Sequence, residues 1–163
     1  MLVSPDGWIY YPRPEPRATW RLFCFPGGGA DASLFFPWAQ LLPSSCEVGA
    51  VQLPGRAPDL DFPCRADAIT LTREIAGAIG DACDLPCIFF GHSLGALLAF
   101  EVARCHLKAS LMPPAHLFLA CAPPPSLPEG VEFARSPART VRRFPETLDT
   151  LSLQGRARWL QID

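Results

Sequence analysis

The segment Gly91-His92-Ser93-Leu94-Gly95 has the pattern Gly-x-Ser-x-Gly, and apolar residues flank it on both sides. The run that ends at Phe90 predicts a strand, and the run that begins at Leu94 predicts a helix. A sharp turn between them places the Ser93 hydroxyl at the carboxyl edge of a sheet, where open α/β sheets bind ligands. We expect a strained, positive φ at Ser93. This context favours a nucleophilic serine over a structural one.

A second segment, Phe25-Pro26-Gly27-Gly28-Gly29-Ala30, directly follows another apolar run. Acyl transfer through a tetrahedral intermediate requires two N–H donors that face the oxyanion. The residue after the nucleophile, Leu94, supplies one, and a glycine-rich loop lets the backbone supply the other. The alternatives are a tight loop without chemistry and a phosphate-binding loop. The second lacks its usual Gly-x-Gly-x-x-Gly or Gly-Lys-Ser/Thr sequence, and the presence of Ser93 favours an oxyanion site.

A serine nucleophile also needs a histidine base and an acid that orients it, in the chain order serine, acid, histidine. The sharp turn should aim the His92 side chain away from Ser93. His106 lies about 20 Å along the predicted helix. His116 begins a strand, so it is expected roughly 15–20 Å away, near the other edge of the sheet. The carboxylates late in the chain are expected to be solvated surface charges: Glu129, Glu132, Glu146, Asp149 and Asp163.

Four apolar segments predict the strands of the sheet, and a fifth predicts a short edge strand. The four are Arg21–Phe25, Val48–Leu53, Cys87–Phe90 and His116–Cys121, and the edge strand is Trp8–Tyr11. Their near-continuous apolar character is typical of strands covered on both faces. Strands that alternate with helices predict right-handed crossovers and a mostly parallel, doubly wound α/β sheet.

Three helices are expected between these strands. Ser33 should cap the first, whose apolar face includes Phe36 and Leu41. Asp67 should cap the second, in which apolar residues recur at helical spacing: Leu71, Ile75, Ala78, Ile79 and Ala82. The third begins at Leu94, runs to about Cys105 and is apolar almost all round, so it should be deeply buried.

Composition narrows the class of protein. Hydrophobic residues make up 49% of the 163 residues and charged residues 18%, which indicates a globular chain with one core. The first twenty residues lack the apolar core of a signal peptide, so a cytoplasmic location is expected. The net charge of −2 gives no reason to expect nucleic acid. The seven cysteines are expected to be buried structural thiols, and no Cys/His spacing predicts a metal site.

The chain divides into three regions. Residues 1–19 form an N-terminal extension, residues 20–122 form the core, and residues 123–163 form an irregular Pro/Arg-rich tail. The tail begins with Pro123-Pro124-Pro125-Ser126-Leu127-Pro128, which breaks any regular element. No strand is expected after Cys121, so the edge of the sheet should be exposed there.

Five segments in order resemble the type II thioesterases that serve polyketide, nonribosomal-peptide and fatty-acid synthases. The most discriminating is Gln-Leu-Pro-Gly-Arg at 52–56, because generic esterases and lipases do not share it. An acidic residue often follows it in the family, and Ala57 stands here. The segments are Phe23-Cys24-Phe25-Pro26-Gly27-Gly28-Gly29, Ser33 to Trp38, Val51-Gln52-Leu53-Pro54-Gly55-Arg56, Gly91-His92-Ser93-Leu94-Gly95-Ala96 and His116-Leu117-Phe118-Leu119.

The resemblance implies an α/β-hydrolase fold and hydrolysis of acyl thioesters on the phosphopantetheine arm of an acyl or peptidyl carrier protein. Ser93 inherits the nucleophile role, and Gly28 and Leu94 inherit the oxyanion donors. No metal or organic cofactor is implied. The family's C-terminal strands, triad acid and triad histidine are expected to be absent. Three explanations of this absence compete: a truncated gene product, a frameshifted tail, or a natural protein with a non-hydrolytic role in binding acyl groups or carriers. A carboxylesterase is a further rival.

Overall fold

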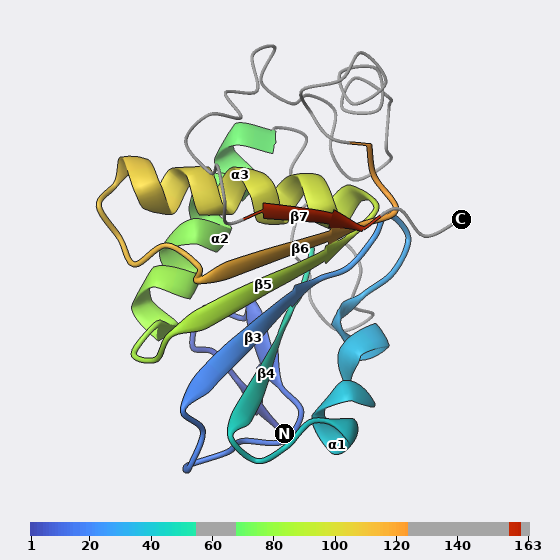
Figure 1. Ribbon diagram of the computed structural model, residues 1–163, viewed down its shortest axis with the longest axis vertical. Coiled ribbons are helices and arrows are strands. Elements are labelled where there is room, and N and C mark those ends of the chain that lie inside the picture. The colour runs from blue at the N-terminus through green and yellow to red at the C-terminus, as the bar shows by residue number, and fades with distance from the viewer. Residues whose placement is uncertain (55–67, 124–156, 161–163) are drawn as a thin grey trace.

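The computed structural model describes residues 1–54 and 68–123, together with the backbone of one strand at 157–160. Seven strands form one sheet in the order β1-β2-β4-β3-β5-β6-β7 (Figure 1). The strands are β1 (Leu2–Val3), β2 (Ile9–Tyr11), β3 (Trp20–Phe25), β4 (Cys46–Val51), β5 (Cys87–His92), β6 (His116–Ala120) and β7 (Ala157–Leu160). The helices are η1 (Ala32–Phe35), α1 (Trp38–Leu41), α2 (Ala68–Ala82) and α3 (Leu94–Lys108).

The sheet is mostly parallel, as the sequence predicts. The strands β4, β3, β5, β6 and β7 are parallel to one another. The N-terminal strands β1 and β2 are antiparallel and extend the sheet beyond β4. The edge strand expected at Trp8–Tyr11 is therefore present as β2, and β1 lies outside it.

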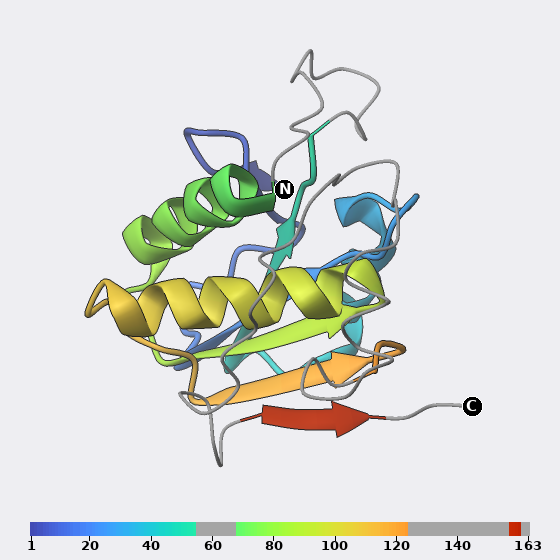
Figure 2. The ribbon, with the colours of Figure 1, turned by 90° about the horizontal axis from the view of Figure 1, so that it is seen from above.

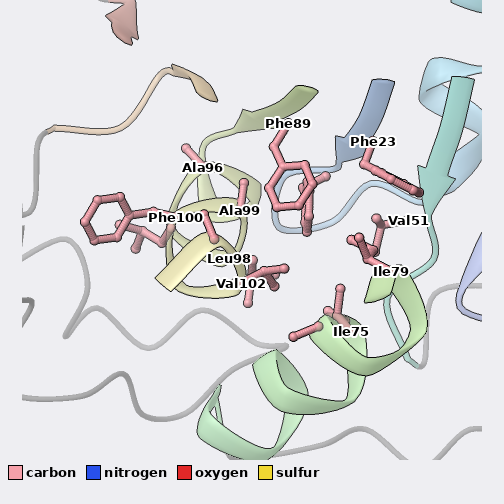
Figure 3. Packing of buried hydrophobic residues seen from close by; sticks show 14 of the residues in the cluster. Phe23, Val51, Ile75, Ile79, Phe89, Ala96, Leu98, Ala99, Phe100 and Val102 are labelled. Atoms are coloured by element: carbon pink, nitrogen blue, oxygen red, sulfur yellow. The ribbon is translucent and has the colours of Figure 1, made fainter. Parts of the chain in front are cut away.

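Two separate clusters of buried side chains show that both faces of the sheet are covered. On one face, α2 and α3 pack on the strands and on each other, as Figure 2 shows. Figure 3 shows this cluster, in which Phe23 and Phe89 of the strands face Ile75 and Ile79 of α2 and Ala99 of α3. On the other face, η1 and α1 pack on β3 and β4. The expected doubly wound arrangement is confirmed.

The central strand β5 shows the alternation that places its residues on the two faces. Phe89 is fully buried toward α2 and α3, and its ring centroid lies 5.9 Å from that of Phe23. Phe90 points to the other face, where its ring centroid lies 4.9 Å from that of Trp38. Successive side chains of a strand point to opposite faces. His92, at the end of β5, is therefore on the same face of the sheet as Phe90, and Gly91 is on the same face as Phe89.

The three expected helical segments are present, and they differ from expectation mainly in their caps. Four of the five predicted core positions of α2 are buried, and the fifth, Ala82, is partly buried. Asp67, the expected cap, lies outside the described residues. The segment after β3 is two short helices, η1 and α1. Its cap is Asp31, whose carboxylate accepts the Ser33 N–H at 2.8 Å. Leu41 was expected on the apolar face, but it is 82% exposed. Ser33 was the wrong cap because Asp31 already occupies the extended position before the first turn.

The expectation that no strand follows Cys121 was wrong. The backbone of β7 pairs in parallel with β6, in the register Leu117 to Ala157 through Ala120 to Leu160. A strand at an open sheet edge is stabilised by its backbone hydrogen bonds, so a segment without an apolar run can still extend the sheet. The rest of the predicted tail, 124–156 and 161–163, lies outside the described residues.

Six of the seven cysteines lie in the described part of the chain and differ in burial, and Cys64 lies outside it. Cys24, Cys46 and Cys87 are buried in the sheet, as predicted, and Cys83 and Cys105 are partly buried. Cys121 is exposed, contrary to prediction, because it lies just beyond β6 in a turn with a positive φ of 56°. Within the described residues, no helix is long and apolar enough to cross a membrane.

Candidate active site

Ser93 lies between the last residue of β5 and the first residue of α3, at φ 54° and ψ −118°. Residues other than glycine rarely adopt this conformation, and its cost is tolerated where surrounding structure enforces it. The predicted strand, sharp turn and helix are confirmed, and so is the positive φ. The Ser93 side chain is partly exposed, whereas Leu94 next to it is 4% exposed.

Two glycines allow the strand and the helix to meet at this turn. A Cβ atom on Gly91 would overlap the Gly95 carbonyl oxygen, and a Cβ atom on Gly95 would overlap the Phe25 carbonyl oxygen. The first turn of α3 therefore lies directly against the end of β3 as well as against β5. Any side chain at either glycine would push Ser93 away from the carboxyl edge of the sheet.

The glycine-rich loop after β3 lies over the Ser93 turn. A Cβ atom on Gly27 would lie 3.0 Å from His92 Nδ1 and 3.5 Å from Ser93 Cβ. A Cβ atom on Gly28 would lie 3.7 Å from Leu94 Cδ2. The structure thus brings together the loop, Ser93 and Leu94, the three components that the sequence pattern singles out.

The N–H groups of Gly28 and Leu94 are both unused within the part of the chain that the structure describes: neither donates a hydrogen bond there. Leu94 is the first residue of α3, where backbone N–H groups have no partner within the helix. The aligned peptide dipoles also favour negative charge at this end of a helix. An anionic oxygen beside Ser93 would therefore meet a favourable field.

None of the three histidines hydrogen-bonds to Ser93 Oγ among the described contacts. The His92 imidazole lies beside Gly27. His106 is fully buried, with its ring nitrogens 2.8 Å from the Met112 carbonyl oxygen and 3.1 Å from the Ala76 carbonyl oxygen. His116 is exposed at the start of β6 and pairs in register with Ile88, four residues before the end of β5.

The acidic candidates lie outside the described residues: Glu129, Glu132, Glu146, Asp149 and Asp163. Asp163 follows the end of β7 at Leu160 by three positions, so the sequence does place one carboxylate after a strand.

Gln52 is a buried residue beside this site that sequence reasoning noted only as part of a family-like element. It directly follows β4, is 6% exposed, and accepts a hydrogen bond from the Ala32 N–H at the start of η1. A single amide placed between an apolar strand and another apolar residue is the sequence signal that points to it. The rest of that element, Gly55 and Arg56, lies outside the described residues.

Comparison with known proteins gives one consistent family. The family model described as "Thioesterase domain" matches residues 20–151. The chain is 33% identical over 144 residues to the linear gramicidin dehydrogenase LgrE of Brevibacillus parabrevis, covering 88% of this chain and 52% of that protein. It is 39% identical over 112 residues to the human medium-chain S-acyl fatty acid synthase thioesterase, covering 68% of this chain and 42% of that protein.

Solved structures agree with the sequence relatives. The type II thioesterase BorB from the borrelidin biosynthetic cluster has a TM-score of 0.68 and 34% identity, over 73% of this chain and 48% of that one. The RedJ thioesterase from the prodiginine pathway of Streptomyces coelicolor has a TM-score of 0.64, also at 34% identity. The chain spans about half the length of the curated relatives it matches. From the family match and the geometry of the Ser93 turn together, the chain belongs to the thioesterase domain family and has its α/β-hydrolase fold.

Proposed function

We propose that the chain carries the nucleophile and oxyanion site of an enzyme that hydrolyses acyl thioesters on the phosphopantetheine arm of acyl or peptidyl carrier proteins. The carrier would belong to a polyketide, nonribosomal-peptide or fatty-acid synthase. The observation that carries the proposal is Ser93 at a positive φ with the Gly27–Gly29 loop packed over it. Three relatives support this substrate class: the human medium-chain S-acyl fatty acid synthase thioesterase, the gramicidin S biosynthesis protein GrsT and the type II thioesterase BorB.

In the proposed reaction, Ser93 Oγ attacks the thioester carbonyl carbon while its proton passes to a base. The N–H groups of Leu94 and Gly28 stabilise the oxyanion that forms. The carbon–sulfur bond then breaks, and the pantetheine sulfur leaves as a thiol with that proton. Water hydrolyses the acyl-serine ester, which releases the carboxylic acid and restores the Ser93 hydroxyl. None of these steps requires a metal or an organic cofactor.

A second candidate function follows from the histidines. No histidine hydrogen-bonds to Ser93 Oγ among the described residues, which is the arrangement expected of a protein that binds acyl groups or carriers without turnover. A carboxylesterase is the rival within the same chemistry, because an identical serine turn serves oxyesters.

Substrate comparison separates the three candidates. The chain, extended by the C-terminal half of a type II thioesterase, would be assayed with an acyl-pantetheine thioester, the matched oxyester and the acyl-carrier protein. Preferred turnover of the thioester, lost in Ser93→Ala, supports the proposal. Preferred turnover of the oxyester indicates a carboxylesterase. Carrier binding without any Ser93-dependent turnover indicates a binding protein.

A further inference from the structure

The side chain of Gln52 connects two segments that are far apart in the sequence. Its Oε1 accepts the Ala32 N–H at 3.2 Å, and its Nε2 donates to the Leu53 carbonyl oxygen at 3.0 Å. Its own backbone N–H donates to the Trp8 carbonyl oxygen at 2.8 Å. With both ends of the amide bonded and 6% of the residue exposed, the side chain has one orientation.

The partner of Gln52, Ala32, closes the loop that carries the proposed oxyanion donor. The loop leaves the sheet after Phe25, which pairs in register with Gly91, and ends at Ala32 where η1 begins. Inside the loop, the Ala30 N–H donates to the Gly27 carbonyl oxygen at 3.2 Å. The upstream end is therefore held by β-sheet pairing, and the Ala32–Gln52 hydrogen bond connects the downstream end to the end of β4.

We propose that Gln52 is a positioning residue that holds the Gly28 N–H at the oxyanion site beside Ser93. This proposal rests on the proposed thioesterase function. The loop has glycines at 27, 28 and 29, and Gly29 has a φ of 97°, so its own backbone restrains it little. A donor that shifts by about 1 Å from the developing oxyanion can lose about 10²-fold in rate. The bond to Gln52 restricts that shift.

Two substitutions remove the same hydrogen bond from opposite sides. Gln52→Met keeps a similar shape and deletes the acceptor, and it also removes the Nε2 bond to the Leu53 carbonyl oxygen, which Ala32→Pro leaves in place. Ala32→Pro deletes the donor at the first position of η1, where proline is favoured. Asp31 before it is already extended at φ −119° and ψ −179°, the conformation that a following proline requires. Gln40→Met, at an exposed residue of α1, is the matched control.

The test measures binding of a linear alkyl boronic acid to the 163-residue chain by ¹¹B NMR titration. The Ser93 oxygen bonds to boron and its proton is released to solvent, which makes the boron tetrahedral and the adduct anionic. One boron-bound hydroxyl then probes the oxyanion site without needing turnover. The planar alkyl amide of the same chain length reports ground-state binding. Thermal unfolding of each variant shows that it is folded at the titration temperature. A purely structural role for Gln52 would weaken both ligands equally.

We expect Gln52→Met and Ala32→Pro each to weaken boronate binding by about 10-fold or more, below the roughly 10²–10³-fold of a lost oxyanion donor. Amide binding and the Gln40→Met control should not change. The double variant should bind boronate no more weakly than Gln52→Met, because the bond that Ala32→Pro removes is already absent there. Wild-type boronate affinity in either folded single variant would overturn the role of Gln52 alone. Boronate binding that survives Ser93→Ala would instead overturn the proposed nucleophile, and the positioning role with it.

Discussion

The backbone N–H of Ser93 donates a hydrogen bond of 2.8 Å to the carbonyl oxygen of Ala120, the last residue of β6. The turn that holds the proposed nucleophile is therefore fixed by three neighbouring strands. It continues β5, it packs through Gly95 against the end of β3, and it is bonded to the end of β6. This support explains how an unfavourable φ persists at Ser93, and it makes the energetics of the turn testable.

Replacement by alanine should lower the stability of the chain at Gly95 in the turn and raise it at Gly77 on the surface of α2. Gly95→Ala should destabilise the chain by about 3 kcal/mol, because the new methyl group would overlap the Phe25 carbonyl oxygen. The control is Gly77→Ala, where nothing lies within 4 Å of the added Cβ. It should stabilise the helix by about 0.5–1 kcal/mol. Urea unfolding measures both changes, and a stable Gly95→Ala protein would contradict the close contact.

The positive φ at Ser93 predicts an unusual order of stability. Ser93→Gly should be about 1 kcal/mol more stable than Ser93→Ala, because glycine adopts this conformation without the cost that a Cβ atom imposes. At Ser33, which lies in η1 and has no positive φ, the same pair of substitutions should show alanine as the more stable. Equal stability of the two Ser93 variants in urea unfolding would show that the turn is relaxed.

The buried ion pair on α3 predicts a pH-dependent effect. Arg104 Nη1 lies 2.8 Å and 3.0 Å from the two carboxylate oxygens of Glu101, and both residues are buried. Burial raises the pKa of Glu101 above its ordinary value of 4.5, while Arg104 opposes the rise. The folded chain thus keeps the Glu101 proton to higher pH than the unfolded chain, and this residue lowers stability as pH rises above about 4.5.

Removing Arg104 should make this dependence steeper. Arg104→Met leaves Glu101 buried without its partner, which costs about 3–5 kcal/mol when the carboxylate is charged. The loss should be larger at pH 8 than at pH 5, where the neutral acid forms more readily. Arg73→Met, at an exposed position of α2, should change stability by less than about 0.5 kcal/mol. An equal loss at both pH values for Arg104→Met would contradict the pKa direction of Glu101.

The sequence predicted the Ser93 turn well because its signals are local. An apolar strand, two small residues and an apolar helix lie within a short segment, and each follows from its own side chains. The cap at Asp31 was missed because two polar residues stood close together and only the backbone conformation decides between them. The strand β7 was missed because Ala157-Arg158-Trp159-Leu160 has no apolar run, and its pairing depends on the distant edge of β6. The role of Gln52 was out of reach for the same reason, since its partner lies twenty positions earlier.

Thioester hydrolysis by four proteins tests directly whether Ser93 is the nucleophile. These are the 163-residue chain, the chain extended by the C-terminal half of a type II thioesterase, and the Ser93→Ala variant of each. No histidine follows His116 in the 163 residues, and in the described part of the chain none of the three hydrogen-bonds to Ser93 Oγ. In a serine protease, losing the triad histidine costs about 10⁶-fold in kcat.

We therefore expect the 163-residue chain to be nearly inert toward an acyl-pantetheine thioester. The extended chain should turn it over, and Ser93→Ala should abolish that turnover. Robust Ser93-dependent hydrolysis by the 163-residue chain alone would contradict the account of its histidines. Turnover by the extended chain that survives Ser93→Ala would show that Ser93 is not the nucleophile.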